Sequence, residues 1–376
     1  MKNHISTFSN LTLNYLVFAF FIGFGLLFFG CKSKEVEEII KPPIIEYIEI
    51  PDVNFEKDLI KLQIDDIQDG KVLKVNVIKV TDLNVSKESN VGGDKIKDLT
   101  GLQSFTNLET FKCSYNDLRN LDLSKNVELK FLYCAHNQMI NIDISKNLKL
   151  MFLECSNNNL SDLDVSKNEK LEELECYGNK LKNLDISKNL VLKRLLCVGN
   201  KLTTLDVSKN VFLEQLYCAD NQLINLNINS SSNLNALDCS YNQLTNLDVS
   251  KNIKLGTIFC AFNKLLNLDI SNNIILGTLY CSNNQLSKLD VNRNPDLVSI
   301  YCNDNQLLSL DISKNPNLQD FNCSKNQLNT LDLRANNNLR YVTCLNNLIQ
   351  IICVSNLNQV TRSWQKDSTA TYKVCP

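Results

Sequence analysis

Cysteine recurs at intervals of 21 residues along most of this chain, and this regularity constrains the fold more than any other feature. Each of these cysteines is followed three residues later by Asn, from Asn116 to Asn347, and is preceded five residues earlier by Leu, from Leu108 to Leu339. Twelve copies in one register are too many for coincidence, so the sequence predicts a stack of equivalent units that share one core. The cysteines are Cys113, Cys134, Cys155, Cys176, Cys197, Cys218, Cys239, Cys260, Cys281, Cys302, Cys323 and Cys344.

The repeated unit reads LxxLxCxxNxLxxLDxSKNxx and resembles a leucine-rich repeat in which Cys takes an apolar position usually held by Leu. The match extends over about residues 96–352, and its two halves, of ten and eleven residues, resemble a short bacterial class of this family. Each half supplies an extended segment whose alternate residues point inward. We therefore expect a mostly β solenoid of about 12 coils, with short parallel strands on both faces of each coil and little helix.

The place of Cys within the unit predicts its role. Each Cys and the apolar residue two before it alternate along the first extended segment, so both face the core. Neighbouring cysteines then lie about 4.8 Å apart and point the same way, which is the wrong approach for a disulfide and gives no tetrahedral ligand set. We expect free, structural thiols, and metal or redox chemistry along the column is the alternative.

Two polar columns accompany the cysteines. The Asn three residues after each Cys carries both a donor and an acceptor, and we expect it to satisfy the backbone groups of a tight turn in every coil. A column of Asp residues, such as Asp122 and Asp143, lies between inward apolar residues and faces solvent, with a Lys three residues later that partly neutralises it. Calcium bound between coils is the alternative reading of the Asp column.

The N-terminus indicates export. Residues 15–30 are uncharged and strongly apolar, a length that suits a signal peptide better than a spanning helix. The segment ends at Gly30-Cys31, which resembles the cleavage site of bacterial lipoproteins and implies that Cys31 becomes the lipidated first residue. The CKSKEVEE segment that begins at Cys31 resembles the sorting signals of Bacteroidetes-type surface lipoproteins. We expect a signal peptide at 1–30 and an outer-membrane lipoprotein exposed at the cell surface, and an uncleaved anchor helix is the alternative.

The segments before the repeats divide into a tether and a cap. Residues 31–50 are charged and contain Pro-Pro, as a tether would. Residues 51–95 resemble the N-terminal caps of related surface proteins, with a helical pattern across Ile50–Ile64 and strand-like alternation over Asp69–Ser86. Such a cap covers the core and the strand edge that a terminal coil exposes.

Residues 353–376 resemble the cap that closes such arrays at the C-terminal end, with Trp364, the only tryptophan, as its anchor. Cys353 and Cys375 lie in this cap and are the two cysteines outside the column and the lipidation site. For an exported chain we expect a disulfide between them. It closes a loop of about 23 residues and stabilises the cap by about 3 kcal/mol.

Composition argues against catalysis and nucleic-acid binding. The formal net charge is −2, so no electrostatic attraction to nucleic acid or to an anionic membrane surface is expected. Beyond the N-terminal segment the chain holds a single histidine, His136, and it contains no GxSxG, HExxH or phosphate-binding glycine loop. We therefore expect neither an enzyme nor a bound cofactor.

The exposed positions of the Cys-bearing segment vary between coils while the framework does not, and aromatic residues gather there in the middle and later coils. Tyr and Phe give large contact area at low entropic cost, which is typical of a recognition surface. We expect an adhesin-like surface that binds an extracellular protein or glycan. Cross-strand packing of the aromatics, in a spacer without a ligand, is the alternative. The expected ligand residues are Tyr217, Tyr241, Phe259, Phe262, Tyr280 and Tyr301.

Overall fold

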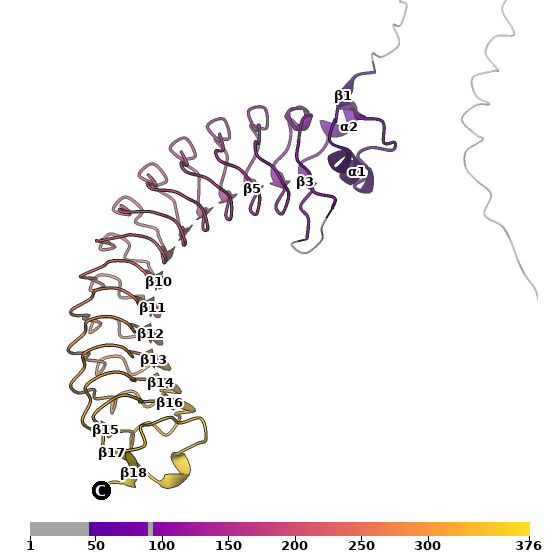
Figure 1. Ribbon diagram of the computed structural model, residues 1–376. Helices are drawn as coiled ribbons and strands as arrows, with labels where there is room; N and C mark the ends of the chain where they lie inside the picture. The colour runs from indigo at the N-terminus through magenta and orange to yellow at the C-terminus, as the bar shows by residue number, and fades with distance from the viewer. Residues whose placement is uncertain (1–44, 89–92) are drawn as a thin grey trace, which may run out of the picture. The chain divides into compact units, whose positions relative to one another are not determined.

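Short strands, one from each coil, build a single parallel sheet. This computed structural model describes residues 45–88 and 93–376, in which 13 strands pair in chain order. The strands are β3 (Asp82–Asn84), β4 (Thr110–Lys112), β5 (Phe131–Tyr133), β6 (Phe152–Glu154), β7 (Glu173–Glu175), β8 (Arg194–Leu196), β9 (Gln215–Tyr217), β10 (Ala236–Asp238), β11 (Thr257–Phe259), β12 (Thr278–Tyr280), β13 (Ser299–Tyr301), β14 (Asp320–Asn322) and β16 (Tyr341–Thr343). The coils stack in an arc with this sheet on its inner side (Figure 1). The expected leucine-rich-repeat solenoid is confirmed.

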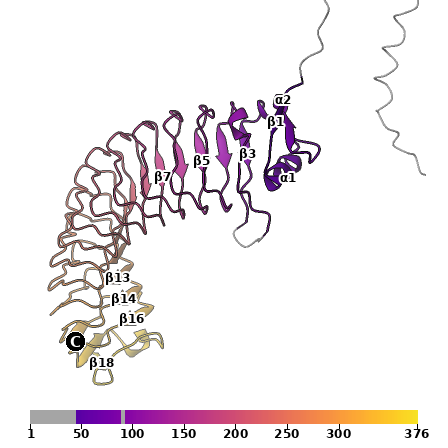
Figure 2. The ribbon, with the colours of Figure 1, turned by 45° about the horizontal axis from the view of Figure 1, so that its top comes forward.

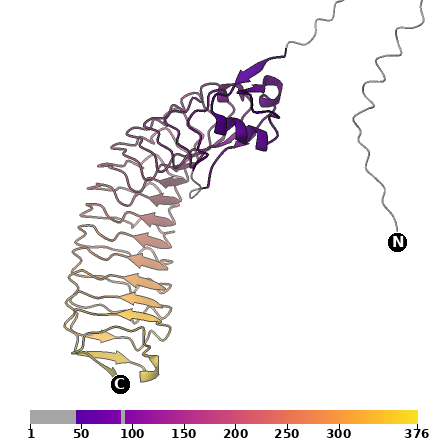
Figure 3. The same ribbon diagram turned by 45° about the vertical axis from the view of Figure 1, so that its right-hand side comes forward.

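The sheet places the same position of every coil on the same face. Figure 2 shows β3, β5 and β7 side by side, and Figure 3 shows the strands continuing in one row toward the C-terminal end. The middle residue of each strand, such as Leu216 of β9, is buried. In β4 to β14 its two neighbours are half-buried and lie on the solvent-facing surface, on the inner side of the arc. Because the pairing is parallel and in register, side chains from equivalent positions form columns along the array.

The cysteines lie in the core, as expected. In the coil of Cys197, the side chains of Leu192, Leu195, Leu202 and Val207 are fully buried around the thiol. All 12 column cysteines are free and buried. Burial disfavours the thiolate and raises the pKa of each column thiol well above its ordinary value.

The Asn that follows each Cys ties neighbouring coils together. Asn137 donates from Nδ2 to the carbonyls of Cys113 in the preceding coil and Cys134 in its own, at 3.0 and 3.2 Å. Its Oδ1 accepts from the Leu118 N–H at 3.0 Å. Both halves of the amide are therefore used on buried backbone groups, which confirms the role expected for this column.

The second segment of each coil does not form the second continuous row of strands that we expected. Among the described residues, strand pairing on that face is confined to an Asp122–Asp143 bridge and a C-terminal sheet. That sheet consists of β15 (Leu331–Asp332), β17 (Ile351–Val354) and β18 (Thr371–Val374). The coils fan out on the outer side of the arc (Figure 1), so the backbones there do not come close enough for a continuous ladder.

A second column of asparagines links the coils on this outer face. Asn147, which ends the SKN tail, is 1 % exposed and donates from Nδ2 to the carbonyls of Leu123 and Asn126 in the preceding coil, at 3.2 and 2.8 Å. On this face, hydrogen bonds from Asn side chains to the preceding coil therefore replace the missing backbone ladder. The sequence pattern predicts the SKN tail but not the burial of its last residue.

The N-terminal cap begins with a strand and a helix. β1 (Tyr47–Glu49) pairs antiparallel with β2 (Lys71–Leu73), so the cap sheet includes residues that we predicted as tether. The helix α1 (Val53–Lys61) begins after Asp52, whose carboxylate accepts from the first turn of the helix. The alternation expected over Asp69–Ser86 is interrupted by a short helix, α2 (Lys74–Val77), which follows β2 directly.

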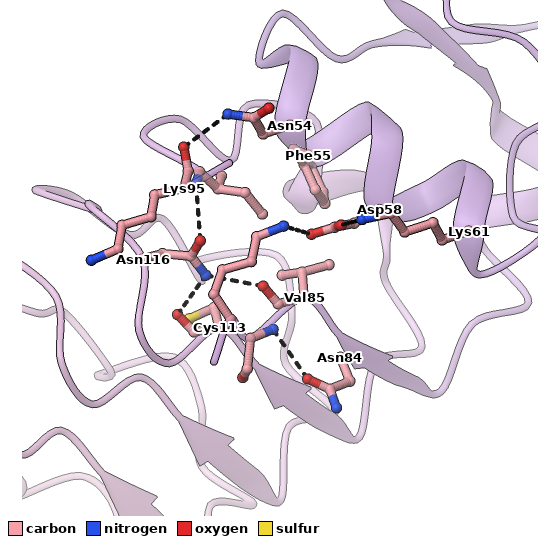
Figure 4. Close-up of polar contacts among 12 residues, drawn as sticks. Asn54, Phe55, Asp58, Lys61, Asn84, Val85, Lys95, Cys113 and Asn116 are labelled. Atoms are coloured by element: carbon pink, nitrogen blue, oxygen red, sulfur yellow. Dashed lines mark hydrogen bonds and ion pairs between the residues drawn. The ribbon is translucent and has the colours of Figure 1, made fainter. Parts of the chain in front are cut away.

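Polar contacts join this cap to the first coil (Figure 4). Val85 follows β3 as Cys113 follows β4, and so occupies the Cys position of the first coil. Asn116 donates from Nδ2 to the carbonyls of both residues, at 3.0 and 3.1 Å. On the helix side, Asn54 of α1 donates to the Lys95 carbonyl at 3.1 Å. The asparagine ladder therefore starts within the cap.

The C-terminal cap contains the expected disulfide. Cys353 of β17 and Cys375 are bonded, with their Cα atoms 5.4 Å apart. Asp367 accepts the N–H of Asn347 at 3.0 Å and so supplies a contact that a further coil would have made. Trp364 is buried in the cap, as expected of an anchor.

Candidate functional site

Two rows of aromatic side chains enclose a groove on the inner face of the sheet. The first row consists of Phe259, Tyr280 and Tyr301, and the second of Tyr241 and Phe262. The groove has a volume of about 760 Å³, which is in the range of ligand sites. It runs along the array, from the turns after β8 and β9 to β13.

The first row is fixed by strand register. Phe259, Tyr280 and Tyr301 are the last residues of β11, β12 and β13, and each pairs in register with the next. Neighbouring ring centroids are 4.7 and 4.4 Å apart, with the planes tilted by 52° and 48°. The rings project away from the core because the preceding residue in each strand points inward. Burial raises the pKa of the Tyr301 hydroxyl.

The second row stands in an unusual backbone conformation. Tyr241 and Phe262 follow their cysteines by two residues and have φ angles of 51° and 56°, in the left-handed region. The same position has a positive φ in every coil, including those with Gly178 and Gly199. The Tyr241 N–H donates to the Ala261 carbonyl of the next coil at 2.9 Å, so the ladder holds this geometry. A left-handed conformation costs a residue with a Cβ about 1–2 kcal/mol.

These two rings are stacked and open to solvent. The ring centroids of Tyr241 and Phe262 are 4.2 Å apart, and their planes differ by 10°. The side chains remain 54 % and 42 % exposed. A large apolar surface is therefore presented at a position where the backbone favours glycine or asparagine.

Small side chains form the floor between the rows. Ser240, Ala261 and Ser282 each follow a column Cys by one residue and line the groove in successive coils. Asp220 and Asp238 line its N-terminal end and are its only charged lining residues. No basic side chain lines the groove, so its electrostatic potential favours a cation.

Five of the six expected ligand residues line this groove, and Tyr217 does not. Asp238 pairs with Tyr217 on one side and with Phe259 on the other, and so separates Tyr217 from the first row. We expected these aromatic residues to gather on one surface, and the structure arranges them there in two rows. The reason is that Phe259 and Tyr280 lie within strands, whereas Phe262 lies in the turn that follows the cysteine.

The sequence did not lead us to predict the small residues of the groove floor or the two aspartates, Asp220 and Asp238. A signal was present, since a small residue follows the cysteine directly in consecutive coils at Ala219, Ser240, Ala261 and Ser282. Small residues next to aromatic positions leave space for a ligand. To predict the groove from sequence, one must know which positions share the sheet surface that carries it. The left-handed turn after each cysteine conceals which positions these are.

A second aromatic cluster lies nearer the N-terminal end. Tyr115 and His136 stack with centroids 4.1 Å apart and planes within 9°. Burial lowers the pKa of His136. Tyr133 and Phe152, on neighbouring strands, lie 4.7 Å apart. The stack of Tyr115 on His136 repeats the geometry of the second row, whereas Tyr133 and Phe152 are diagonal neighbours and not in register. This cluster provides control positions for the groove.

The outer Asp column is organised by backbone hydrogen bonds. Asp122 accepts from the Ser124 N–H at 2.9 Å, and this bond is the main reason why the pKa of Asp122 is lowered. The Lys three residues later also lowers the pKa of Asp122, as expected, although its contribution is smaller. Among the described residues, the close ion pair of this column is that of Arg334 with Asp332, at 2.9 Å. The turn that follows Asp122 directs its carboxylate toward the Ser124 N–H. In the part of the chain that the structure describes, no cluster of three or more His, Cys, Asp or Glu residues is arranged to hold a metal ion.

The expected lipidation site, Cys31, lies outside the described residues. In residues 45–88 and 93–376, no helix is both long and apolar enough to cross a membrane.

No family model and no curated protein matches the chain. Among solved structures, the functional domain of InlJ from Listeria monocytogenes, which includes a cysteine ladder, is 28% identical; the match covers 85% of this chain and 81% of that chain, with a TM-score of 0.66. An internalin (InlF) from Listeria monocytogenes is 19% identical over 86% and 95%, with a TM-score of 0.70. A leucine-rich-repeat protein of Leptospira interrogans is 20% identical over 74% and 81%, with a TM-score of 0.64. These similarities show the leucine-rich-repeat fold.

Proposed function

We propose that this chain is a cell-surface lipoprotein that binds an extracellular protein or glycan through the groove between its two aromatic rows. The observation that carries the proposal is the open groove of about 760 Å³, which has aromatic walls and a floor of small side chains. Leucine-rich-repeat solenoids generally present the inner face of their arc to a partner. The chain acts by binding and not by catalysis.

The backbone strain at Tyr241 and Phe262 supports a role in binding over a role in packing alone. Tyr241 and Phe262 together cost about 2–4 kcal/mol in the left-handed region, whereas a stacked aromatic pair returns about 0.5–1.5 kcal/mol. Stability alone would therefore favour Gly or Asn at both positions. Strained residues of this kind cluster at functional sites.

The spacer alternative explains only part of this surface. Cross-strand packing accounts for Phe259, Tyr280 and Tyr301, whose rings contact one another along the sheet. It does not account for the solvent exposure of Tyr241 and Phe262 at the wall of the groove.

Capture of a partner by the full-length protein tests this function. We expect the wild type to retain a protein or glycan from panels of envelope proteins, host-matrix proteins and glycans. Ala261→Trp, which fills the floor of the groove with a large ring, should abolish retention. Ala135→Trp, at the equivalent position of an earlier coil, is the matched control. Equal retention by wild type and Ala261→Trp would place the binding face elsewhere, and no retained partner would favour the spacer.

The lipid anchor is tested separately. Wild type should partition with membranes, and Cys31→Ala should not, because the residue that carries the lipid is absent. Ser33→Ala is the control that keeps the cysteine. Membrane partitioning of Cys31→Ala equal to that of the wild type would contradict lipidation at this residue.

A further inference from the structure

The two carboxylates at the N-terminal end of the groove lack basic partners. Among the described residues, Asp238 accepts one hydrogen bond, from the Ser240 N–H at 3.0 Å, and neither it nor Asp220 pairs with a Lys or Arg. By contrast, Asp304, at the position equivalent to Asp220 four coils later, pairs with Lys325 at 3.0 Å. Two negative charges therefore flank one end of an aromatic groove without internal compensation.

The stacked rings leave one face open at this same end. Because Tyr241 and Phe262 come from successive coils and their planes are within 10° of parallel, the ring faces point along the array. Phe262 covers one face of Tyr241. The other face is turned toward the preceding coil, where Asp220 occupies the equivalent position. A π face and a carboxylate therefore come from adjacent coils at the same end of the groove.

We propose that the occupant of the groove is an extended peptide segment of a partner protein, with an arginine or lysine held between Asp220, Asp238 and the open face of Tyr241. This inference rests on the proposed function and names its ligand class. A guanidinium stacks on aromatic rings and pairs with carboxylates, so this end of the groove suits it. Apolar side chains that follow the basic residue lie over Ala261, between the two rows.

The size of the groove fits a short segment. The coils from β9, which precedes Asp220, to β13, which carries Tyr301, span four strand intervals, or about 19 Å at ~4.8 Å each. An extended chain rises ~3.3 Å per residue, so about six residues cover this length. The segment crosses the strands and does not extend the sheet, because the caps cover the sheet edges. Its side chains therefore carry the recognition.

A glycan fits this groove less well. Sugar rings stack on broad aromatic faces, but Phe262 and Tyr241 each cover one face of the other. The first row is tilted, with each ring against the next, and presents no flat platform. The acidic end, in addition, favours a cation over a neutral sugar.

Selection from a random heptapeptide phage library against the immobilised full chain tests the inference. The enriched peptides should carry Arg or Lys followed by apolar residues. The best peptide, made synthetically, should bind at least about tenfold more weakly when its arginine is replaced by citrulline, which keeps the shape and removes the charge. Asp220→Asn with Asp238→Asn should give a similar loss, and 1 M salt should weaken the wild type more than this variant.

Matched controls separate this inference from the proposed function. Asp290→Asn with Asp311→Asn makes the same charge change in the outer Asp column and should leave peptide binding unchanged. Enrichment of peptides without a basic residue, full affinity of the citrulline peptide, or absence of any enriched peptide would overturn the inference. If Ala261→Trp abolishes capture of the partner but Asp220→Asn with Asp238→Asn does not weaken it, the groove is the binding site and its ligand is not a basic peptide. A glycan captured in the same groove would give that second result.

Discussion

Tyr241 and Phe262 stack with their ring centroids 4.2 Å apart, although the backbone of both residues lies in the left-handed region. The ladder hydrogen bonds impose this conformation on the position two residues after every column cysteine. An aromatic residue there gains surface for binding at the expense of folding stability. Stability and binding should therefore respond in opposite directions to substitution at this position.

Tyr241→Asn should change the free energy of unfolding by between about −0.5 and +1.5 kcal/mol. The change relieves about 1–2 kcal/mol of backbone strain and loses a stacking contribution of about 0.5–1.5 kcal/mol. Binding of the partner should weaken, because one wall of the groove is removed. Urea unfolding and a binding isotherm measure the two effects. Asn283→Tyr, the reverse change two coils further along, should lower stability. A loss of more than about 1 kcal/mol in Tyr241→Asn would contradict the presence of backbone strain at this residue.

Alkaline pH should unfold the array steeply. Burial raises the pKa of Cys155 and Cys281 to about 12, whereas an unfolded thiol titrates near ~8.5. The folded pKa is the higher one, so this stability is complete below about pH 8.5 and is lost as the pH rises toward the folded value. Each thiol loses ~1.4 kcal/mol per pH unit in that window, so the 12 column thiols together make the decline steep. Circular dichroism against pH should show unfolding between about pH 9 and 10.

A variant with fewer thiols tests whether the cysteine column causes this effect. Replacing Cys197, Cys218 and Cys239 with Ala removes three of the 12 column thiols, so the slope of unfolding free energy against pH above 8.5 should fall by about a quarter. The slope is compared because the Ala cavities lower stability at every pH. An unchanged slope would mean that other groups control alkaline unfolding.

Asn200→Ala should lower the free energy of unfolding by about 3 kcal/mol or more. Asn200 donates to the carbonyls of Cys176 and Cys197, at 3.0 and 3.1 Å, and accepts from the Leu181 N–H at 3.0 Å. Alanine leaves three buried backbone groups without these partners. Asp206→Ala, in the exposed column of the same coil, is the control and should cost less than about 1 kcal/mol. Equal losses in urea unfolding would contradict the ladder role.

Loss of the Cys353–Cys375 bond should destabilise the C-terminal cap locally. Its sequence separation is 22 residues, and a loop of that size contributes about 3 kcal/mol. Hydrogen exchange in Cys353→Ala should accelerate in β17 and β18 and remain slow in the central strands, since each coil contacts only its neighbours. Cys375→Ala and the double variant should behave identically. Faster exchange throughout the sheet would show that the cap controls the whole array.

The repeat alone predicts most of the fold. A 21-residue register of Leu, Cys and Asn determines which side chains enter the core, and Cys197 or Asn137 can be placed from spacing without coordinates. The outer face was harder to predict, because its linkage by Asn147 depends on how the coils diverge along the arc. That divergence is a property of the whole array and leaves no local pattern.

The candidate site could be predicted only in part. Aromatic residues such as Tyr280 and Tyr301 were identified because they alternate with buried residues in a strand. The left-handed position was missed because Tyr241 and Phe262 are unlike the residues that usually occupy it. Gly178 and Asn157, at the same position in other coils, are the signal that would have revealed it.

The dissociation constant of the captured partner for Tyr280→Ala with Tyr301→Ala tests the central claim most directly. These rings form one wall of the groove and contact each other at 4.4 Å. Tyr133→Ala with Phe152→Ala, a pair at 4.7 Å on the same sheet, is the matched control, and melting temperatures confirm that both variants fold. The groove predicts a loss of at least about 2 kcal/mol in binding, roughly thirtyfold, for the first variant and little change for the second. Undiminished affinity in a well-folded Tyr280→Ala/Tyr301→Ala protein would contradict the proposal that this groove is the binding site.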